Sequence, residues 1–257
     1  MAQAVTRGPV SGTATPVQTK KRKPFLIDFY STAVGKKYVM AITGIIGIGF
    51  VIFHMVGNLK VYLGLITEDG ERVYDIDVYG EFLRELLVPI LPRTVALWLL
   101  RIVLIVALVL HVHAACALTV MNRRARPMRY QSHRDYVVAN FASRTMRWTG
   151  VIVLLFIFFH LADLTWGWFN PDFVRGEVYR NLDASLSRIP VAILYIVANI
   201  ALGIHLFHGT WSLFQSMGWN NPRFNAWRRG LATAIATVVV VGNVSFPIAV
   251  QAGIVAV

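Results

Sequence analysis

Histidine is the residue type in this chain best placed to do chemistry, because six of its seven copies fall within long apolar stretches. A histidine inside a membrane span is costly and rare, so it indicates a functional site. The six lie in four different stretches, as His54, His111 with His113, His160, and His205 with His208. Stretches that each contribute one or two imidazoles predict a metal or haem centre held between helices.

Five apolar stretches must position these side chains, at about 38–58, 95–120, 148–168, 189–213 and 231–255. Each reaches the roughly 20 residues that cross a bilayer as a helix. Hydrophobic residues make up 56% of the chain and mean hydropathy is +0.57, which excludes an ordinary soluble domain. We therefore expect an all-α membrane protein with one five-helix domain over 25–257 and a disordered basic tail at 1–24.

The distribution of charge predicts the orientation of the bundle. Of the 25 Lys and Arg residues, 17 lie before span one, between spans two and three, or between spans four and five, whereas 11 of the 13 acidic residues lie on the opposite side. By the positive-inside rule the N-terminus is cytoplasmic and the C-terminus outside, in a multi-pass protein of the inner (plasma) membrane. The net charge of +12 is thus not a sign of nucleic-acid binding. We expect short helices in the outer loops, over 79–88 and within 169–188, and identify no usable internal repeat.

Alternating span directions sort the histidines into two layers. His54 lies 17 residues beyond the last basic residue before it, and His160 lies 13 beyond, or roughly 25 and 20 Å from the inner edge. These two form an outer pair, as bis-histidine ligation of a haem requires. The histidines of spans two and four lie nearer the cytoplasm and form an inner group: His111, His113, His205 and His208.

Helix geometry limits the ligands within the inner group. His111 and His113 point about 200° apart, so both cannot face one iron. His205 and His208 share a helix face, and Cys116 shares one with His113. Two or more of the four histidines therefore ligate, while a remaining one bonds a haem propionate, a quinone oxygen or a backbone carbonyl.

Three groups of short motifs extend over about 30–250. The first contains Ser31-Thr-Ala-Val-Gly-Lys-Lys37, Met40-Ala-Ile-Thr-Gly44 and His54-Met-Val-Gly-Asn58. The second contains Leu110-His111, Leu118-Thr119, Asn122-Arg123, Ala125-Arg126-Pro127 and Tyr130, and the third contains His205-Leu-Phe-His208-Gly209-Thr-Trp211-Ser212 and Phe214-Gln215-Ser-Met-Gly218. Together they resemble the single-chain cytochrome b membrane subunit of succinate dehydrogenase and fumarate reductase, respiratory complex II.

The resemblance implies a five-helix anchor for a flavoprotein subunit and an iron–sulfur subunit on the cytoplasmic face, with two b haems and a quinone site. His54 and His160 would hold the outer haem, and His111 with His205 or His208 the inner one. The implied function is electron transfer from the iron–sulfur subunit to quinone during succinate oxidation, a step of the tricarboxylic acid cycle, with no catalytic residue or dehydrogenase active site on this chain. The alternatives are a quinol:fumarate reductase anchor and a histidine-based proton transporter.

Two departures from the family pattern leave the inner cofactor open. His113 and Cys116 stand where ordinary helix residues are expected, and histidine with cysteine is also the ligand set of a Rieske-type iron–sulfur cluster. A single cysteine falls short of that set, and a small buried hydrophobe is its simpler role. Span four carries no acidic residue, which favours succinate oxidation over the reverse reaction because an intramembrane carboxylate would suggest a proton path.

A quinone needs an apolar slot with a few polar groups at its carbonyls. Candidates at the cytoplasmic ends of spans one and four are Tyr30, Ser31, Lys36, Lys37, Trp211, Ser212 and Gln215. Their plainer roles are snorkelling cations, interfacial aromatics and helix caps. Arg101 lies within span two, where we expect it to face the interior and pair with a haem propionate or with Asp163.

Overall fold

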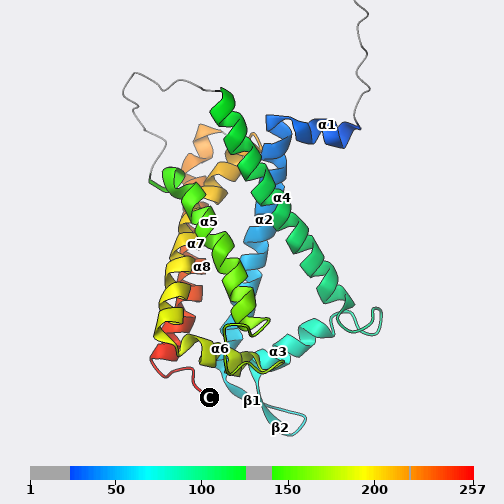
Figure 1. The fold of residues 1–257 in the computed structure, drawn as a ribbon, viewed down its shortest axis with the longest axis vertical. Coiled ribbons are helices and arrows are strands. Elements are labelled where there is room, and N and C mark those ends of the chain that lie inside the picture. The colour runs from blue at the N-terminus through cyan, green and yellow to red at the C-terminus, as the bar shows by residue number, and fades with distance from the viewer. Residues whose placement is uncertain (1–23, 126–140, 220) are drawn as a thin grey trace, which may run out of the picture.

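A computed structural model describes residues 24–125, 141–219 and 221–257, so the expected tail at 1–24 lies almost entirely outside the described residues. Long helices run between two ends, which we call the α1 end and the hairpin end after the elements found there (Figure 1). The long helices are α2 (Ala33–Asn58), α4 (Val95–Ala125), α5 (Phe141–Leu164), α7 (Ile189–Ser216) and α8 (Asn225–Gln251). All five are long and apolar enough to cross a membrane, which confirms the predicted fold class.

The observed helix ends differ from the predicted spans by up to seven residues, the largest difference being the start of α5. α2 begins five residues before the expected start and continues into a 3-10 turn, η1 (Leu59–Leu63). α5 ends at Leu164 rather than at residue 168 because its last turn closes early. The Trp166 N–H donates to the Leu161 carbonyl at 2.9 Å, and Gly167 adopts a φ of +73°, a left-handed conformation that ends helices.

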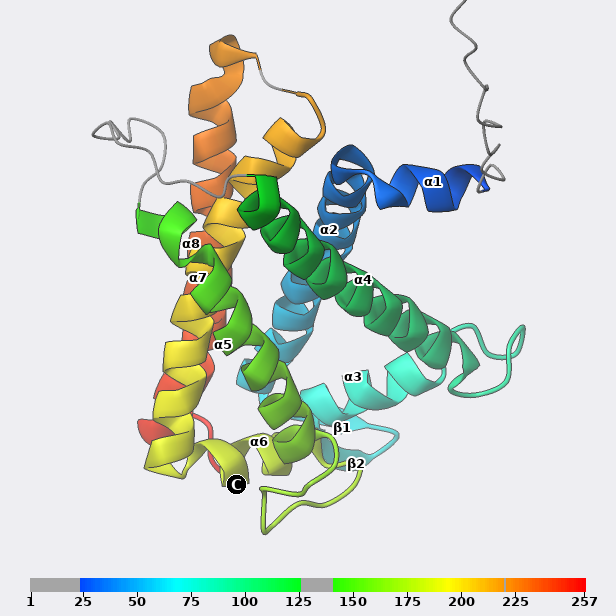
Figure 2. The ribbon, with the colours of Figure 1, turned by 45° about the horizontal axis from the view of Figure 1, so that its top comes forward.

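The long helices pack as two pairs with a fifth helix alongside. α4 packs mainly on α2, α5 mainly on α7, and α8 covers α7. α7 and α8 approach closely at Gly203, where an added Cβ would lie 2.2 Å from Val240 Cγ2. The short helix α1 (Phe25–Ser31) projects sideways from the start of α2 (Figure 2). A cofactor held by histidines from both helix pairs would therefore lie between the α2/α4 pair and the α5/α7 pair.

Small elements close the hairpin end. Strands β1 (Leu65–Glu68) and β2 (Glu71–Tyr74) form an antiparallel hairpin that leads into α3 (Asp75–Arg84), and α6 (Val178–Leu186) precedes α7. Two helices in these loops were expected, and the first begins four residues earlier than predicted. The buried cluster here joins α3, α6, α7 and α8 and contains Val61, Ile76, Tyr179, Leu182, Leu186, Tyr195, Phe246, Ala249, Val250 and Val255.

Asp77 of α3 caps α6, 101 residues further along the chain. Its Oδ1 accepts the backbone N–H groups of Val178 at 2.5 Å and Tyr179 at 3.0 Å, which satisfies two donors at the start of α6. Burial raises the pKa of Asp77 above its ordinary value, although these two hydrogen bonds act in the opposite direction. The contact ties the loop after α2 to the loop before α7.

We expect Asp77→Ala to destabilise the protein by about 1 kcal/mol, the usual effect of removing a cap, whereas Asp77→Asn keeps an acceptor oxygen and loses less. Because the folded-state pKa is raised, the contribution of Asp77 to stability falls as pH rises between its unfolded and folded pKa values. Asp77→Asn abolishes that pH dependence. Thermal unfolding of the three proteins over a pH series checks both effects, and identical curves for Asp77→Ala and the parent would contradict the capping role.

Candidate functional site

Two histidines from different helix pairs meet in the half of the bundle nearer the hairpin end. His54 of α2 and His160 of α5 have ring centroids 5.8 Å apart and ring planes at 85°. Two imidazoles that bind one iron at about 2 Å have centroids about 6 Å apart, so this hairpin-end pair suits a bis-histidine haem. His54 Nε2 is also 3.3 Å from Asn58 Nδ2, one helical turn away. Metal binding at this nitrogen requires the Asn58 amide to turn aside.

A second pair lies nearer the α1 end. His111 of α4 and His205 of α7 have ring centroids 6.4 Å apart and planes at 64°. Like the hairpin-end pair, this α1-end pair joins the α2/α4 and α5/α7 helix pairs. Of the four inner-group histidines, the structure therefore brings together His111 and His205.

Threonine hydroxyls set the orientation of the α1-end pair. Thr43 Oγ1 donates to the Val39 carbonyl at 2.7 Å and lies 3.1 Å from His111 Nδ1. A hydroxyl that already donates accepts the Nδ1–H proton, which leaves the Nε2 lone pair for a metal. Thr149 repeats the arrangement, with a bond to the Met146 carbonyl at 3.0 Å and His205 Nδ1 at 3.4 Å.

A glycine follows each threonine and lets the histidine ring approach the helix. An added Cβ at Gly44 would lie 3.6 Å from His111 Cε1, and one at Gly150 would lie 3.3 Å from His205 Cε1. The second distance is tight enough to displace the ring. Helices α2 and α5 thus present the same surface, a threonine followed by a glycine. In each case this surface faces the histidine of the partner helix in the same pair, α4 for α2 and α7 for α5.

A short motif that occurs twice in the sequence marks this arrangement, although we predicted no internal repeat. Met40-Ala-Ile-Thr43-Gly44 and Met146-Arg-Trp-Thr149-Gly150 share the pattern Met-x-x-Thr-Gly, and each glycine is followed ten residues later by a histidine of the hairpin-end pair. The α2/α4 and α5/α7 pairs are therefore internal equivalents. The roles of Thr43 and Thr149 as histidine partners were missed.

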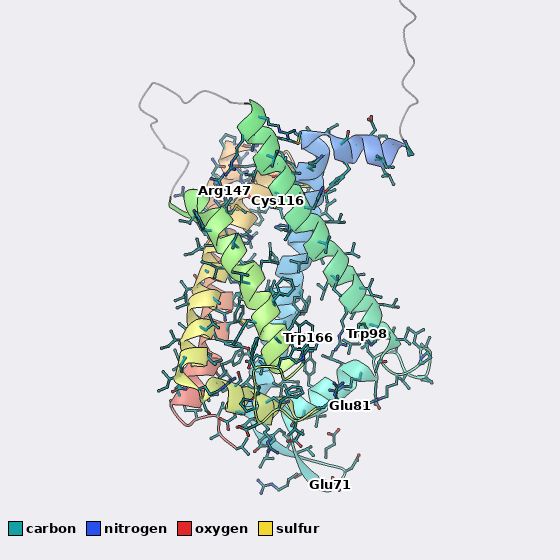
Figure 3. All side chains as sticks on the ribbon, viewed as in Figure 1. Glu71, Glu81, Trp98, Cys116, Arg147 and Trp166 are labelled. Atoms are coloured by element: carbon teal, nitrogen blue, oxygen red, sulfur yellow. The ribbon has the colours of Figure 1, made fainter. Side chains whose placement is uncertain are left out.

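The remaining inner histidines have other surroundings. His113 is exposed on α4, and its Nδ1 is hydrogen-bonded to the Tyr30 hydroxyl at 2.5 Å. His208 is half-buried on α7. Cys116 is also exposed, and Figure 3 places it near the α1 end of α4. Within the described residues no group of three or more histidine, cysteine or acidic side chains is arranged to hold a metal, so the Rieske-type alternative finds no ligand set there.

The expected quinone-site residues fall into two groups on different helices. Lys36 Nζ donates to the carbonyls of Tyr30 at 2.7 Å and Ser31 at 3.0 Å and lies 4.9 Å from the Tyr30 ring centroid. Lys37 is exposed. The first group therefore gathers around the Tyr30–His113 hydrogen bond.

The second group surrounds the end of α7. The guanidinium of Arg228 lies 5.3 Å from the Trp211 ring centroid, and Ser212 Oγ donates to the Gly209 carbonyl at 3.1 Å. Gln215 is exposed. A shallow apolar hollow of about 370 Å³ opens nearby, lined by Phe214, Trp219, Phe224, Trp227 and Arg228. No contact recorded among the described residues joins this group to Tyr30.

Asp163 forms its ion pair with Arg188. Of the two partners expected for Arg101, a haem propionate or Asp163, the second was therefore wrong. Asp163 is fully buried at the end of α5, and Arg188 Nη2 donates to its Oδ1 at 2.8 Å. Arg188 immediately precedes α7 and so reaches Asp163 from the same helix pair. Arg101 is exposed on α4, with its guanidinium 5.0 Å from the Trp98 ring centroid. Figure 3 shows Trp98 near the hairpin end of that helix.

Comparison with known protein families gives a match over part of the chain. Residues 119–244 match the family model of the succinate dehydrogenase/fumarate reductase transmembrane subunit. The match supports membership of that family. It spans 126 of the 257 residues, from the end of α4 into α8, and includes His160 and His205 but not His54 or His111. No curated protein and no solved structure matches the chain. A membrane-anchor role is consistent with this family.

Proposed function

We propose that this chain is the membrane anchor and electron-transfer subunit of a succinate:quinone oxidoreductase. The observation that carries the proposal is the presence of two histidine pairs, each at a separation suited to one iron and each bridging the two helix pairs. The family match over 119–244 supports the same assignment. A b haem bound in each pair supplies one-electron transfer.

The residues take distinct roles in this proposal. His54 and His160 hold one haem and His111 and His205 the other, with Thr43 and Thr149 orienting the second pair. Arg101 remains a candidate partner for a haem propionate. Stacking the two pairs along the bundle places carriers at two depths.

We place the quinone at the α1 end, beside the Tyr30–His113 hydrogen bond. Reduction of a quinone to a quinol takes up protons as well as electrons. A phenol hydrogen-bonded to an imidazole is a group that can deliver those protons. Lys36 fixes the backbone that presents Tyr30.

The flavoprotein and iron–sulfur partners dock on the α1 end, which we take as the cytoplasmic face of the plasma membrane. The described arginines at this end are Arg123, Arg124, Arg147, Arg223, Arg228 and Arg229. Such a concentration of positive charge marks the cytoplasmic side of a membrane protein. The dehydrogenase chemistry then belongs to the partners. We propose succinate oxidation as the direction because α7 carries no carboxylate that would indicate a proton path.

The haem content of the purified complex tests this function. We expect two haem b groups per complex, and one in His54→Ala or His160→Ala. His133→Ala is the matched control, because His133 lies in the segment between α4 and α5 in the sequence, and should leave both haems. Absence of b-type absorbance from the intact complex would overturn the proposal and favour a proton transporter. Faster fumarate reduction than succinate oxidation would instead reverse the direction.

A further inference from the structure

We propose that Tyr195 and Asp163 are positioning residues for His160 and set the reduction potential of the centre at the hairpin-end pair. The inference rests on the proposed function, since it concerns the cofactor that His160 would hold. We call Asp163, Ser185, Arg188 and Tyr195 the Asp163 cluster.

The first step is the contact with the histidine. His160 Nδ1 lies 3.3 Å from the Tyr195 hydroxyl oxygen, and that hydroxyl donates to Asp163 Oδ2 at 3.0 Å. Because the tyrosine proton is committed to the carboxylate, its oxygen accepts Nδ1–H from His160. The imidazole is thereby held as the tautomer whose Nε2 carries the lone pair for a metal.

The second step is the rigidity of the carboxylate. Asp163 is fully buried and receives hydrogen bonds from Ser185 Oγ as well as from Arg188 and Tyr195. Three donors from α6, the α6–α7 junction and α7 leave it no freedom to move. The ion pair with Arg188 and the two hydroxyl donors offset the cost of burying this carboxylate.

Packing holds the Tyr195 side chain in place as firmly as hydrogen bonds hold the Asp163 carboxylate. The residue is 6% exposed, and the Phe156 ring meets it edge to face with centroids 4.9 Å apart. Asn199 Nδ2 donates to its backbone carbonyl at 2.8 Å. The hydroxyl therefore lies between His160 and Asp163 without a choice of rotamer.

The two histidine pairs differ in the group to which the neighbouring hydroxyl donates its proton. At the α1-end pair each histidine meets a threonine hydroxyl that donates to a backbone carbonyl. At the hairpin-end pair the hydroxyl donates to an anion, so its oxygen carries more negative charge and the histidine becomes a more basic ligand. A more basic ligand favours the oxidised iron, so the Asp163 cluster lowers the potential of its own centre relative to the same site without it.

Redox titration of the intact complex, followed by haem absorbance, tests the inference. Tyr195→Phe keeps the ring and removes the hydroxyl, and we expect one haem, and only one, to become easier to reduce by about tenfold, or about 59 mV for a one-electron couple. Asp163→Asn should move the same haem in the same direction. Arg188 is one-third exposed on its side chain and can turn to water in that variant.

Tyr62→Phe is the matched control. Tyr62 also lies near the hairpin end and donates to Ser245 Oγ at 2.7 Å, but among the described residues it makes no hydrogen bond or ring contact with either histidine pair. It should leave both potentials unchanged, and the second haem serves in every sample as the internal standard for a folded bundle. If the complex that contains the unsubstituted chain holds no haem, that result would count against the proposed function and not against this inference.

Two results would overturn the inference while leaving the proposed function intact. One is equal behaviour of Tyr195→Phe and Tyr62→Phe. The other is a shift in Asp163→Asn with none in Tyr195→Phe, because the carboxylate would then act through space and not through the tyrosine.

Discussion

Replacing His205 or His111 with alanine is expected to remove the haem nearer the α1 end and leave the other in place, so haem content halves. Quinone reduction by succinate falls by at least about 100-fold, since outer-shell changes alone cost 10–100-fold in metal sites and a lost ligand costs more. The centroids of the two rings lie 6.4 Å apart, a separation suited to one iron. Pyridine haemochrome analysis with a quinone-reduction assay measures both effects.

His208→Ala and His113→Ala are the matched controls, because each removes a histidine from the same helix within three residues of a proposed ligand. Both should retain two haems. His113→Ala is expected to impair quinone reduction nonetheless, since it breaks the hydrogen bond to Tyr30. Loss of a haem in His208→Ala with retention in His205→Ala would exchange the roles we assign on α7.

The spacing of His205 and His208 explains why the sequence alone left the ligand open. Residues three apart share a helix face, so periodicity cannot separate them. The structure separates them because Thr149 and Gly150 of α5 approach His205 and not His208. Which histidine meets a partner helix depends on helix rotation, a tertiary property that no single span encodes.

The fold was easier to predict than the site. Long apolar stretches must form helices in lipid, so the five spans were predictable to within a few residues at most ends. The β1–β2 hairpin was not, because its strands have four residues each and show little alternation of burial. The partner of Asp163 was also mispredicted, since Arg188 lies 25 residues away in a loop whose path the sequence does not specify.

Removing Arg188 is expected to destabilise the protein by about 3 kcal/mol, because it leaves Asp163 as a buried charge without its cation. Asp163 is 0% exposed, and Arg188 Nη2 provides its one ion pair within the described residues, at 2.8 Å. Ser185 and Tyr195 still donate to the carboxylate but do not neutralise it. Thermal unfolding of Arg188→Ala in the intact complex measures the loss, and the double variant Asp163→Asn with Arg188→Gln should recover most of it.

Arg180→Ala supplies the comparison that isolates burial from charge. Arg180 pairs with Glu177 at 3.4 Å, but both side chains are about half exposed, so the pair contributes about 0–1 kcal/mol. Equal losses in Arg180→Ala and Arg188→Ala would show that desolvation of Asp163 does not govern the stability of the hairpin end. A larger loss in Arg188→Ala, recovered by the double variant, ties the rigidity of the Asp163 cluster to the same ion pair that orients Tyr195 toward His160.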